Sequence, residues 1–160
     1  MADDWIDDLK KRDTTESEDE RRREEIRLRN DRTIQAEAPE FWNALVERVK
    51  ADCAKLLSRY PHRPDRQAHV AQERAGLFVL EGKALPIRVV SLNLNLNSRS
   101  IRVTKSTRDQ FGGHVPMAKE QIEIGIDPSD SLVFETQGVE FRTTEDLAKY
   151  LFDFVLDLSK

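Results

Sequence analysis

The sequence is poor in cysteine, glycine and proline, and it contains no long apolar run. Its single cysteine, Cys53, excludes a disulfide within the chain and is typical of a reducing compartment. No stretch approaches the roughly 20 apolar residues that a membrane-spanning helix needs. The acidic N-terminus lacks the apolar segment of a secretory signal. We therefore expect a soluble, cytoplasmic protein with no membrane-spanning helix.

The sequence also has little that indicates nucleic-acid or metal chemistry. A formal net charge of -4 argues against nucleic acid as a partner, because the phosphate backbone attracts basic surfaces. The three histidines, His62, His69 and His114, lack the closely spaced thiolates or carboxylates of a metal site. No catalytic or nucleotide-binding motif is present. The sequence therefore favours a non-catalytic protein over an enzyme, and it predicts neither a cofactor nor a metal.

Charge dominates the first part of the chain. In residues 14–37, acidic residues and arginines four positions apart predict a polar helix with little buried surface. Before it, Trp5, Ile6 and Leu9 share one helical face among aspartates, which is typical of a peptide that lies in a groove of another protein. Packing on its own domain, docking on a second copy or a disordered segment would explain the same residues. We interpret residues 1–37 as a charged helical extension.

A second, amphipathic helix is predicted to begin at Pro39 and to end at Tyr60. Proline is favoured in the first helical turn, and the residue before a proline is disfavoured in a helix. Between Phe41 and Leu56 the apolar residues recur at spacings of three and four, so one face of this helix should pack on a core. The proline-containing residues 61–75 are predicted to form a connector.

Alternation of apolar and polar residues predicts two strands over residues 87–96 and 100–106. From Val90 to Leu96 every second residue is apolar, with serine and asparagines between them, and Ile101 and Val103 resume the apolar phase in the second strand. One face of the hairpin should therefore be core and the other should face solvent. A two-residue turn between these strands would set Asn95 opposite Arg102. The next 13 residues, 107–119, are predicted to form a long loop, either mobile or functional.

The remaining pattern completes an α+β fold. Further strands are predicted at 77–80, 122–126, 132–136 and 139–141, followed by a C-terminal helix over 144–158. Sequential hairpins indicate an antiparallel meander of about six strands, with the amphipathic helix and the C-terminal helix packed on one face. We interpret residues 38–160 as a single α+β domain.

Several apolar residues are left without an obvious place in this core. They predict a non-catalytic interaction or scaffold module that self-associates through its N-terminal helical region, as a homodimer or in a larger protein complex. The candidate partner-binding residues are Trp5, Ile6, Leu9, Ile26, Ile34, Tyr150, Phe152 and Leu156.

An alternative function uses the polar face of the sheet. Asparagine is unfavourable in strands, so Asn93 and Asn95 beside Arg102 suggest a ligand surface, to which His114 on the 107–119 loop could contribute. This pattern would suit a small-ligand-binding or enzymatic domain. A solvated sheet face explains the same residues without any ligand.

Overall fold

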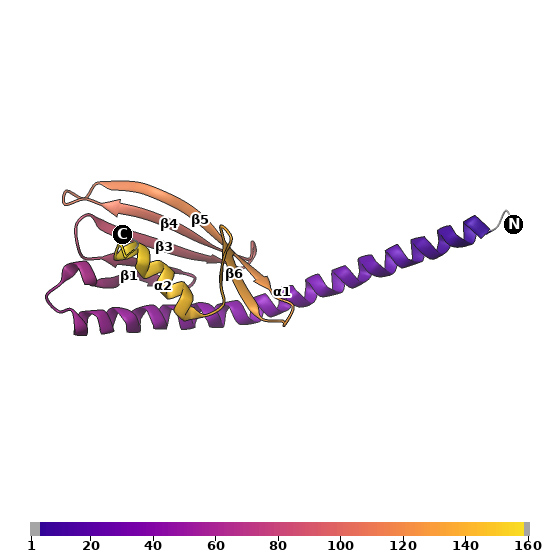
Figure 1. The fold of residues 1–160 in the computed structure, drawn as a ribbon, viewed down its shortest axis with the longest axis horizontal. Coiled ribbons are helices and arrows are strands. Elements are labelled where there is room, and N and C mark those ends of the chain that lie inside the picture. The colour runs from indigo at the N-terminus through magenta and orange to yellow at the C-terminus, as the bar shows by residue number, and fades with distance from the viewer. Residues whose placement is uncertain (1–3, 159–160) are drawn as a thin grey trace. The chain divides into compact units, whose positions relative to one another are not determined.

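The computed structural model describes residues 4–158 and shows one long helix, a seven-stranded sheet and a short C-terminal helix (Figure 1). The chain divides into two units, with the boundary between Thr33 and Ile34. The elements are α1 (Asp4–Arg59), the 3-10 turn η1 (Pro64–Arg66), β1 (Ala68–Arg74), β2 (Leu77–Gly82), β3 (Ile87–Asn95), β4 (Ser100–Arg108), β5 (His114–Ile126), β6 (Leu132–Thr136), β7 (Val139–Phe141) and α2 (Thr144–Val155).

The first unit is a helical segment without a core of its own. Every side chain from residue 4 to residue 29 is exposed. Ion pairs one turn apart join Arg21 to Glu25 at 4.0 Å and Arg27 to Glu24, with Arg27 Nε donating at 3.0 Å. Such pairs between neighbouring turns stabilise a helix locally. The helix in this unit therefore rests on local interactions.

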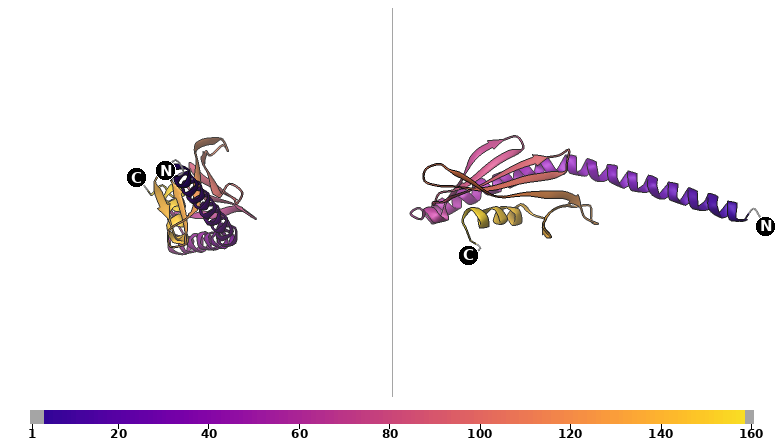
Figure 2. Two further views of the ribbon diagram at one scale, coloured as in Figure 1. Left: turned by 90° about the vertical axis from the view of Figure 1, so that its right-hand side faces the viewer. Right: turned by 90° about the horizontal axis from the view of Figure 1, so that it is seen from above.

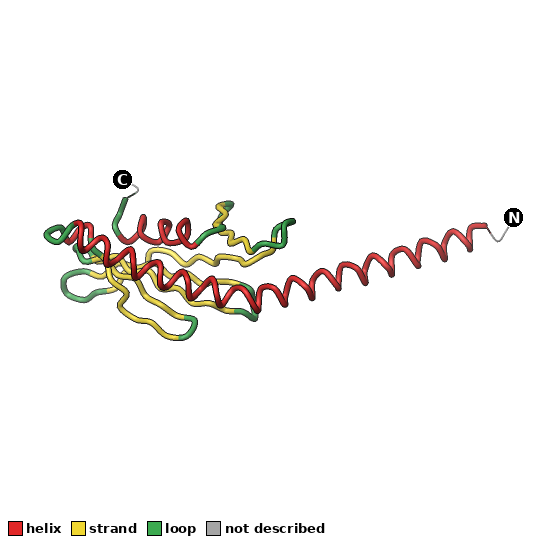
Figure 3. The backbone as a smooth tube through the Cα atoms, turned by 90° about the horizontal axis from the view of Figure 1, so that it is seen from below, coloured by secondary structure: helices red, strands yellow, loops and turns green. Residues whose placement is uncertain are grey.

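The second unit contains the core. Its seven strands form one antiparallel sheet in chain order, β1 to β7, and α2 lies alongside it (Figures 2 and 3). From α1, Trp42 contacts Phe78 of β2 and Phe41 stacks on Phe134 of β6, so the helix packs on the sheet. The largest fully buried side chains are Ile34, Leu45, Val49, Phe78, Leu80, Val90, Leu92, Ile101, Ile122, Phe134, Leu147 and Leu151. The predicted α+β class and antiparallel meander are confirmed.

Helix α1 continues through Pro39, so the predicted start of a separate helix at this residue is wrong. Proline inside a helix removes a hydrogen bond and crowds the preceding turn, at a cost of about 3 kcal/mol. Trp42, Leu45 and Val49 are buried in the following turns. Each contributes about 1.5–3 kcal/mol by burial, so packing outweighs the local cost of the proline.

The β3–β4 hairpin has the predicted faces but a different register. Asn93, and not Asn95, lies opposite Arg102, because the turn has four residues instead of two. Asn95 accepts a hydrogen bond from the backbone N–H of Ser98 at 3.2 Å, and Arg99 has a φ of 49°. A shift by two residues leaves every side chain on the same face. The alternation therefore could not distinguish the two registers.

Strand β1 occupies about half of the segment that was predicted to be a connector. Only Ala68 of this strand is buried, and its exposed positions include His69 and Glu73. Its pairing with β2 is irregular between Val70 and Gln72. Because β1 lies at the edge of the sheet, it buries little, and its sequence carries only a weak apolar alternation.

The predicted loop over residues 107–119 is also wrong, because β4 and β5 extend into it. Only the five residues between Arg108 and His114 form the turn. Asp109 Oδ1 accepts hydrogen bonds from the N–H groups of Phe111 at 2.9 Å and Gly113 at 2.8 Å. This side chain therefore orders the turn, and Phe111 at its tip is exposed.

The final hairpin and the start of α2 agree with the sequence. Phe134 lies opposite Phe141 across a two-residue turn, in which Gln137 and Gly138 have φ values of 50° and 80°. Thr143 Oγ1 then accepts from the N–H of Asp146 at 3.1 Å and caps α2. The predicted register and the predicted helix start are confirmed here.

Candidate functional site

The candidate partner-binding residues of α1 lie in different environments. Trp5, Ile6, Leu9 and Ile26 are exposed, and Trp5 keeps 63% of its surface accessible. Ile34 is instead buried in the core of the second unit. Trp5, Ile6 and Leu9 therefore form one exposed apolar cluster of the first unit that is available to a partner.

The candidate residues at the C-terminal helix are partly engaged in the second unit. Phe152 is 7% exposed and belongs to the core, while Leu156 is half-buried and packs against it. Tyr150 is half-buried with its ring 5.0 Å from that of Phe141. Phe152 and Leu156 also line a groove between α1 and α2.

Tyr150 belongs to a polar cluster that sequence reasoning missed. Lys105 Nζ donates to Glu120 Oε1 and to the Tyr150 hydroxyl oxygen, each at 3.0 Å, and the Tyr150 hydroxyl donates to Glu120 Oε2. The Lys105 and Glu120 side chains are only 13% and 9% exposed. Lys105 is in phase with Ile101 and Val103 of β4, so the alternation could have placed it on the core face.

The electrostatics of this cluster favour anchoring over catalysis. Burial raises the pKa of Tyr150, and its hydrogen bond to Glu120 raises it further, so the phenol stays protonated at neutral pH. Burial opposes a charged Lys105, but the bonds with Tyr150 and Glu120 outweigh it and raise the pKa of the lysine. The cluster therefore joins α2 to β4 and β5 through a charged lysine and a protonated phenol.

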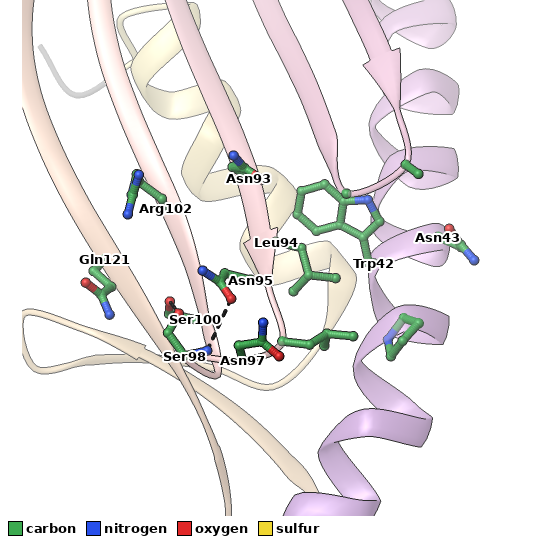
Figure 4. A pocket seen from close by; sticks show the side chains of 14 residues that line it. Trp42, Asn43, Asn93, Leu94, Asn95, Asn97, Ser98, Ser100, Arg102 and Gln121 are labelled. Carbon is green, nitrogen blue, oxygen red and sulfur yellow. Dashed lines mark hydrogen bonds between the residues drawn. The ribbon is translucent and has the colours of Figure 1, made fainter.

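A polar hollow of about 650 Å³ lies where the turns after β1 and β3 approach α1 (Figure 4). Asn93, Arg102 and Gln121 occupy one row across β3, β4 and β5. Trp42 and Leu94 supply apolar surface. The hollow can therefore offer amide and guanidinium groups to a polar ligand.

Three of the four residues of the alternative ligand face line this hollow. Arg102 forms no ion pair or hydrogen bond within residues 4–158, whereas the Asn95 amide oxygen is used by Ser98. His114 does not line the hollow, because it pairs with Arg108 beside the β4–β5 turn. The histidine is thus separated from the asparagines that were predicted to act with it.

Other reactive groups give no further site in the described chain. Burial, with the negative charge of Asp52, raises the pKa of Cys53 to about 11, so the thiol is protonated at neutral pH. Within residues 4–158 no three histidine, cysteine, aspartate or glutamate side chains are grouped so that they could hold a metal ion. In the same residues, no helix is long and apolar enough to cross a membrane.

Comparisons of the chain with protein-family models, with curated protein sequences and with solved structures give no significant match.

Proposed function

We propose that the protein is a non-catalytic interaction module that self-associates through its N-terminal helical region. The supporting observation is the exposed cluster of Trp5, Ile6 and Leu9 in a helix whose other side chains are mostly charged. Exposed apolar groups of this size favour burial against a second surface. The three aspartates Asp4, Asp7 and Asp8 make the same segment acidic, and they would select a basic partner surface.

The ion pairs of the first unit support the same function. They stabilise the helix without using Trp5, Ile6 or Leu9, so these side chains are free to contact a partner. Tryptophan is also among the residues that contribute most to protein–protein interfaces.

Molar mass measured by light scattering between about 5 and 500 μM, a range that suits a weak interface of small area, tests this function. We expect the mass to rise with concentration in the parent chain and to stay monomeric in a Trp5→Ala/Leu9→Ala variant. Leu28→Ala removes another exposed leucine from the same unit and should leave the mass unchanged. A parent chain that is monomeric throughout this range contradicts self-association.

Tryptophan fluorescence gives an independent measurement. Trp5 is exposed and Trp42 is buried, so association should shift the emission of Trp5 to shorter wavelength while Trp42 changes little. The shift should follow the molar mass and disappear in a Trp5→Phe variant. A shift that persists without Trp5 would assign the burial to a different surface.

The polar hollow favours a second candidate function, binding of a small polar ligand. Arg102 with the amides of Asn93 and Gln121 would suit a carboxylate. Succinate at about 10 mM, a concentration that detects millimolar binding, should then shift the side-chain amide NMR signals of Asn93 and Gln121. Arg102→Met should abolish the shift, and unshifted signals in the parent chain would exclude this use of the hollow.

A further inference from the structure

A groove of about 410 Å³ lies between the C-terminal part of α1 and α2, within the second unit. Its floor is apolar and includes Leu56 of α1, Phe152 of α2, and Leu156 and Leu158, which follow α2. Leu158 is exposed and Leu56 and Leu156 are half-buried, so the floor is accessible from outside. The second unit therefore carries a concave apolar surface that its own core does not cover.

The rim of this groove has uncompensated positive charge. Arg48 pairs with Asp52 at 3.2 Å and with Glu145 at 4.0 Å, so both acids of the rim already have a cationic partner. Lys55 and Arg59 of α1 and Lys149 of α2 also line the groove. They are exposed, and none of the three forms an ion pair or hydrogen bond in the described part of the chain. An acidic apolar helix would complement this surface.

We propose that the groove receives the helical segment Asp4–Leu9 of a second copy of this chain. The inference rests on the proposed self-association and names its receptor surface. The segment offers three large apolar side chains and three aspartates, and the groove offers an apolar floor and three free cations. Amphipathic helices bind apolar grooves in this way in many complexes.

The spacing within the segment supports this fit. At 100° per residue, Trp5, Leu9 and Ile6 lie within an arc of about 100°, and the three aspartates lie outside that arc. The apolar face can therefore meet the floor while the aspartates reach toward the rim. No ion pair inside the described chain occupies Asp4, Asp7 or Asp8.

The contact joins two different surfaces, so two copies can make it reciprocally. Each copy then places its own segment in the groove of the other, and the pair closes with twofold symmetry. The interface is small and polar at its rim, so the association should be weak and should decrease with rising salt concentration.

Charge exchange between segment and groove tests the proposal in the full-length chain. A groove variant, Lys55→Glu/Lys149→Glu, has an acidic groove that faces the acidic segment. A segment variant, Asp7→Lys/Asp8→Lys, has a basic segment that faces the basic groove. Like charges facing each other at an interface oppose association, so each variant alone should associate at least about tenfold more weakly than the parent chain. In an equimolar mixture the acidic groove meets the basic segment and the basic groove meets the acidic segment. Association should therefore return in the mixture.

The outcomes separate this inference from the proposed function. Self-association that survives in the groove variant but fails in Trp5→Ala/Leu9→Ala overturns the groove and leaves self-association standing. A parent chain that stays monomeric overturns both proposals. Mixing that restores nothing also overturns the groove. Arg74→Glu/Lys119→Glu changes two exposed cations that do not line the groove, and this control should associate like the parent chain. Unchanged thermal stability and circular dichroism in all variants ensure that folding is not the cause.

Discussion

Leu9 and Leu45 lie in the same helix, α1, but in different units. Leu45 is fully buried against the sheet, whereas Leu9 is 38% exposed. In the first unit the helix is stabilised by pairs such as Arg21 with Glu25, which involve only neighbouring turns. In the second unit the same helix is stabilised by packing on distant strands.

This difference shows that one continuous helix is stabilised in two ways. Where packing stabilises the helix, its apolar side chains are buried in the core. Where charge pairs stabilise it, its apolar residues remain available for binding. Trp5 is therefore exposed and available for contact, whereas Trp42 is buried in the core, although both are tryptophans of α1.

Hydrogen exchange should reveal the largest difference between the two parts of α1. At concentrations where the chain is monomeric, we expect amides of residues 10–30 to be protected about tenfold, because helices held by local interactions alone are marginally stable. Amides of residues 42–56 should be protected at least about 1000-fold, because they open only with the core. Equal protection along α1 would break the comparison and would indicate that the first unit has tertiary contacts.

Matched leucine truncations should give the next largest effect. Leu45→Ala should lower the free energy of unfolding by about 2–5 kcal/mol, because a fully buried side chain leaves a cavity. Leu9→Ala should change it by no more than about 0.5 kcal/mol, as exposed substitutions do. Urea denaturation of the monomer measures both. A large loss for Leu9→Ala would mean that this residue packs within its own chain.

The Lys105 cluster sharpens the comparison between buried and exposed charge. Lys105→Met should cost about 1–3 kcal/mol, because Glu120 and Tyr150 lose a hydrogen-bond partner inside the structure. Lys119→Met, next to Glu120 on β5 and exposed, is the matched control and should be close to neutral. Equal effects at the two lysines would show that the cluster adds no stability.

The pH dependence of the same variant follows from the raised pKa values. Lys105 and Tyr150 both have a higher pKa in the folded protein, relative to ordinary values of 10.5 and 10.0. Their contribution to the free energy of unfolding is therefore fully present below about pH 10, and it is lost as the pH rises through the pKa values of the folded protein. The stability difference between the parent chain and Lys105→Met should narrow above pH 10. A constant difference would contradict the linkage.

The smallest expected effect distinguishes two asparagines on the polar sheet face. Asn93→Thr should keep or slightly raise stability, because threonine is better suited to a strand. Asn95→Thr should cost about 0.5–1.5 kcal/mol, because the Asn95 side chain holds the N–H of Ser98 in the turn. A marked loss at Asn93 would mean that its amide is also part of the structure.

Much of the fold was accessible from the sequence because it depends on local periodicity. The alternation around Leu92 and the spacing around Leu45 predicted a strand and a buried helix face. The Gln137–Gly138 turn fixed the register between β6 and β7, because both of its residues adopt a positive φ. At β3–β4 the longer turn before Ser100 shifted the pairing by two residues, which periodicity cannot detect.

The candidate sites were only partly accessible from the sequence, for a physical reason. The acidic apolar segment around Trp5 is local, so its residues could be selected from the sequence. The groove brings Lys55 of α1 beside Lys149 of α2, residues almost a hundred positions apart in the chain. The hollow likewise joins Trp42 to Asn93. Such pairings depend on how helices lie on a sheet, which no local pattern encodes.

The sequence by itself determined the fold class, the faces of the strands and the local character of the N-terminal helix. These properties arise from residue spacing, charge pairs and turn chemistry. Tertiary structure alone decided that α1 continues through Pro39, that β1 joins the sheet, and that Lys105 meets Tyr150. In each case contacts with residues far away in the sequence decided the structure. Burying a large apolar side chain stabilises the fold by more than the local conformational preference of one residue does.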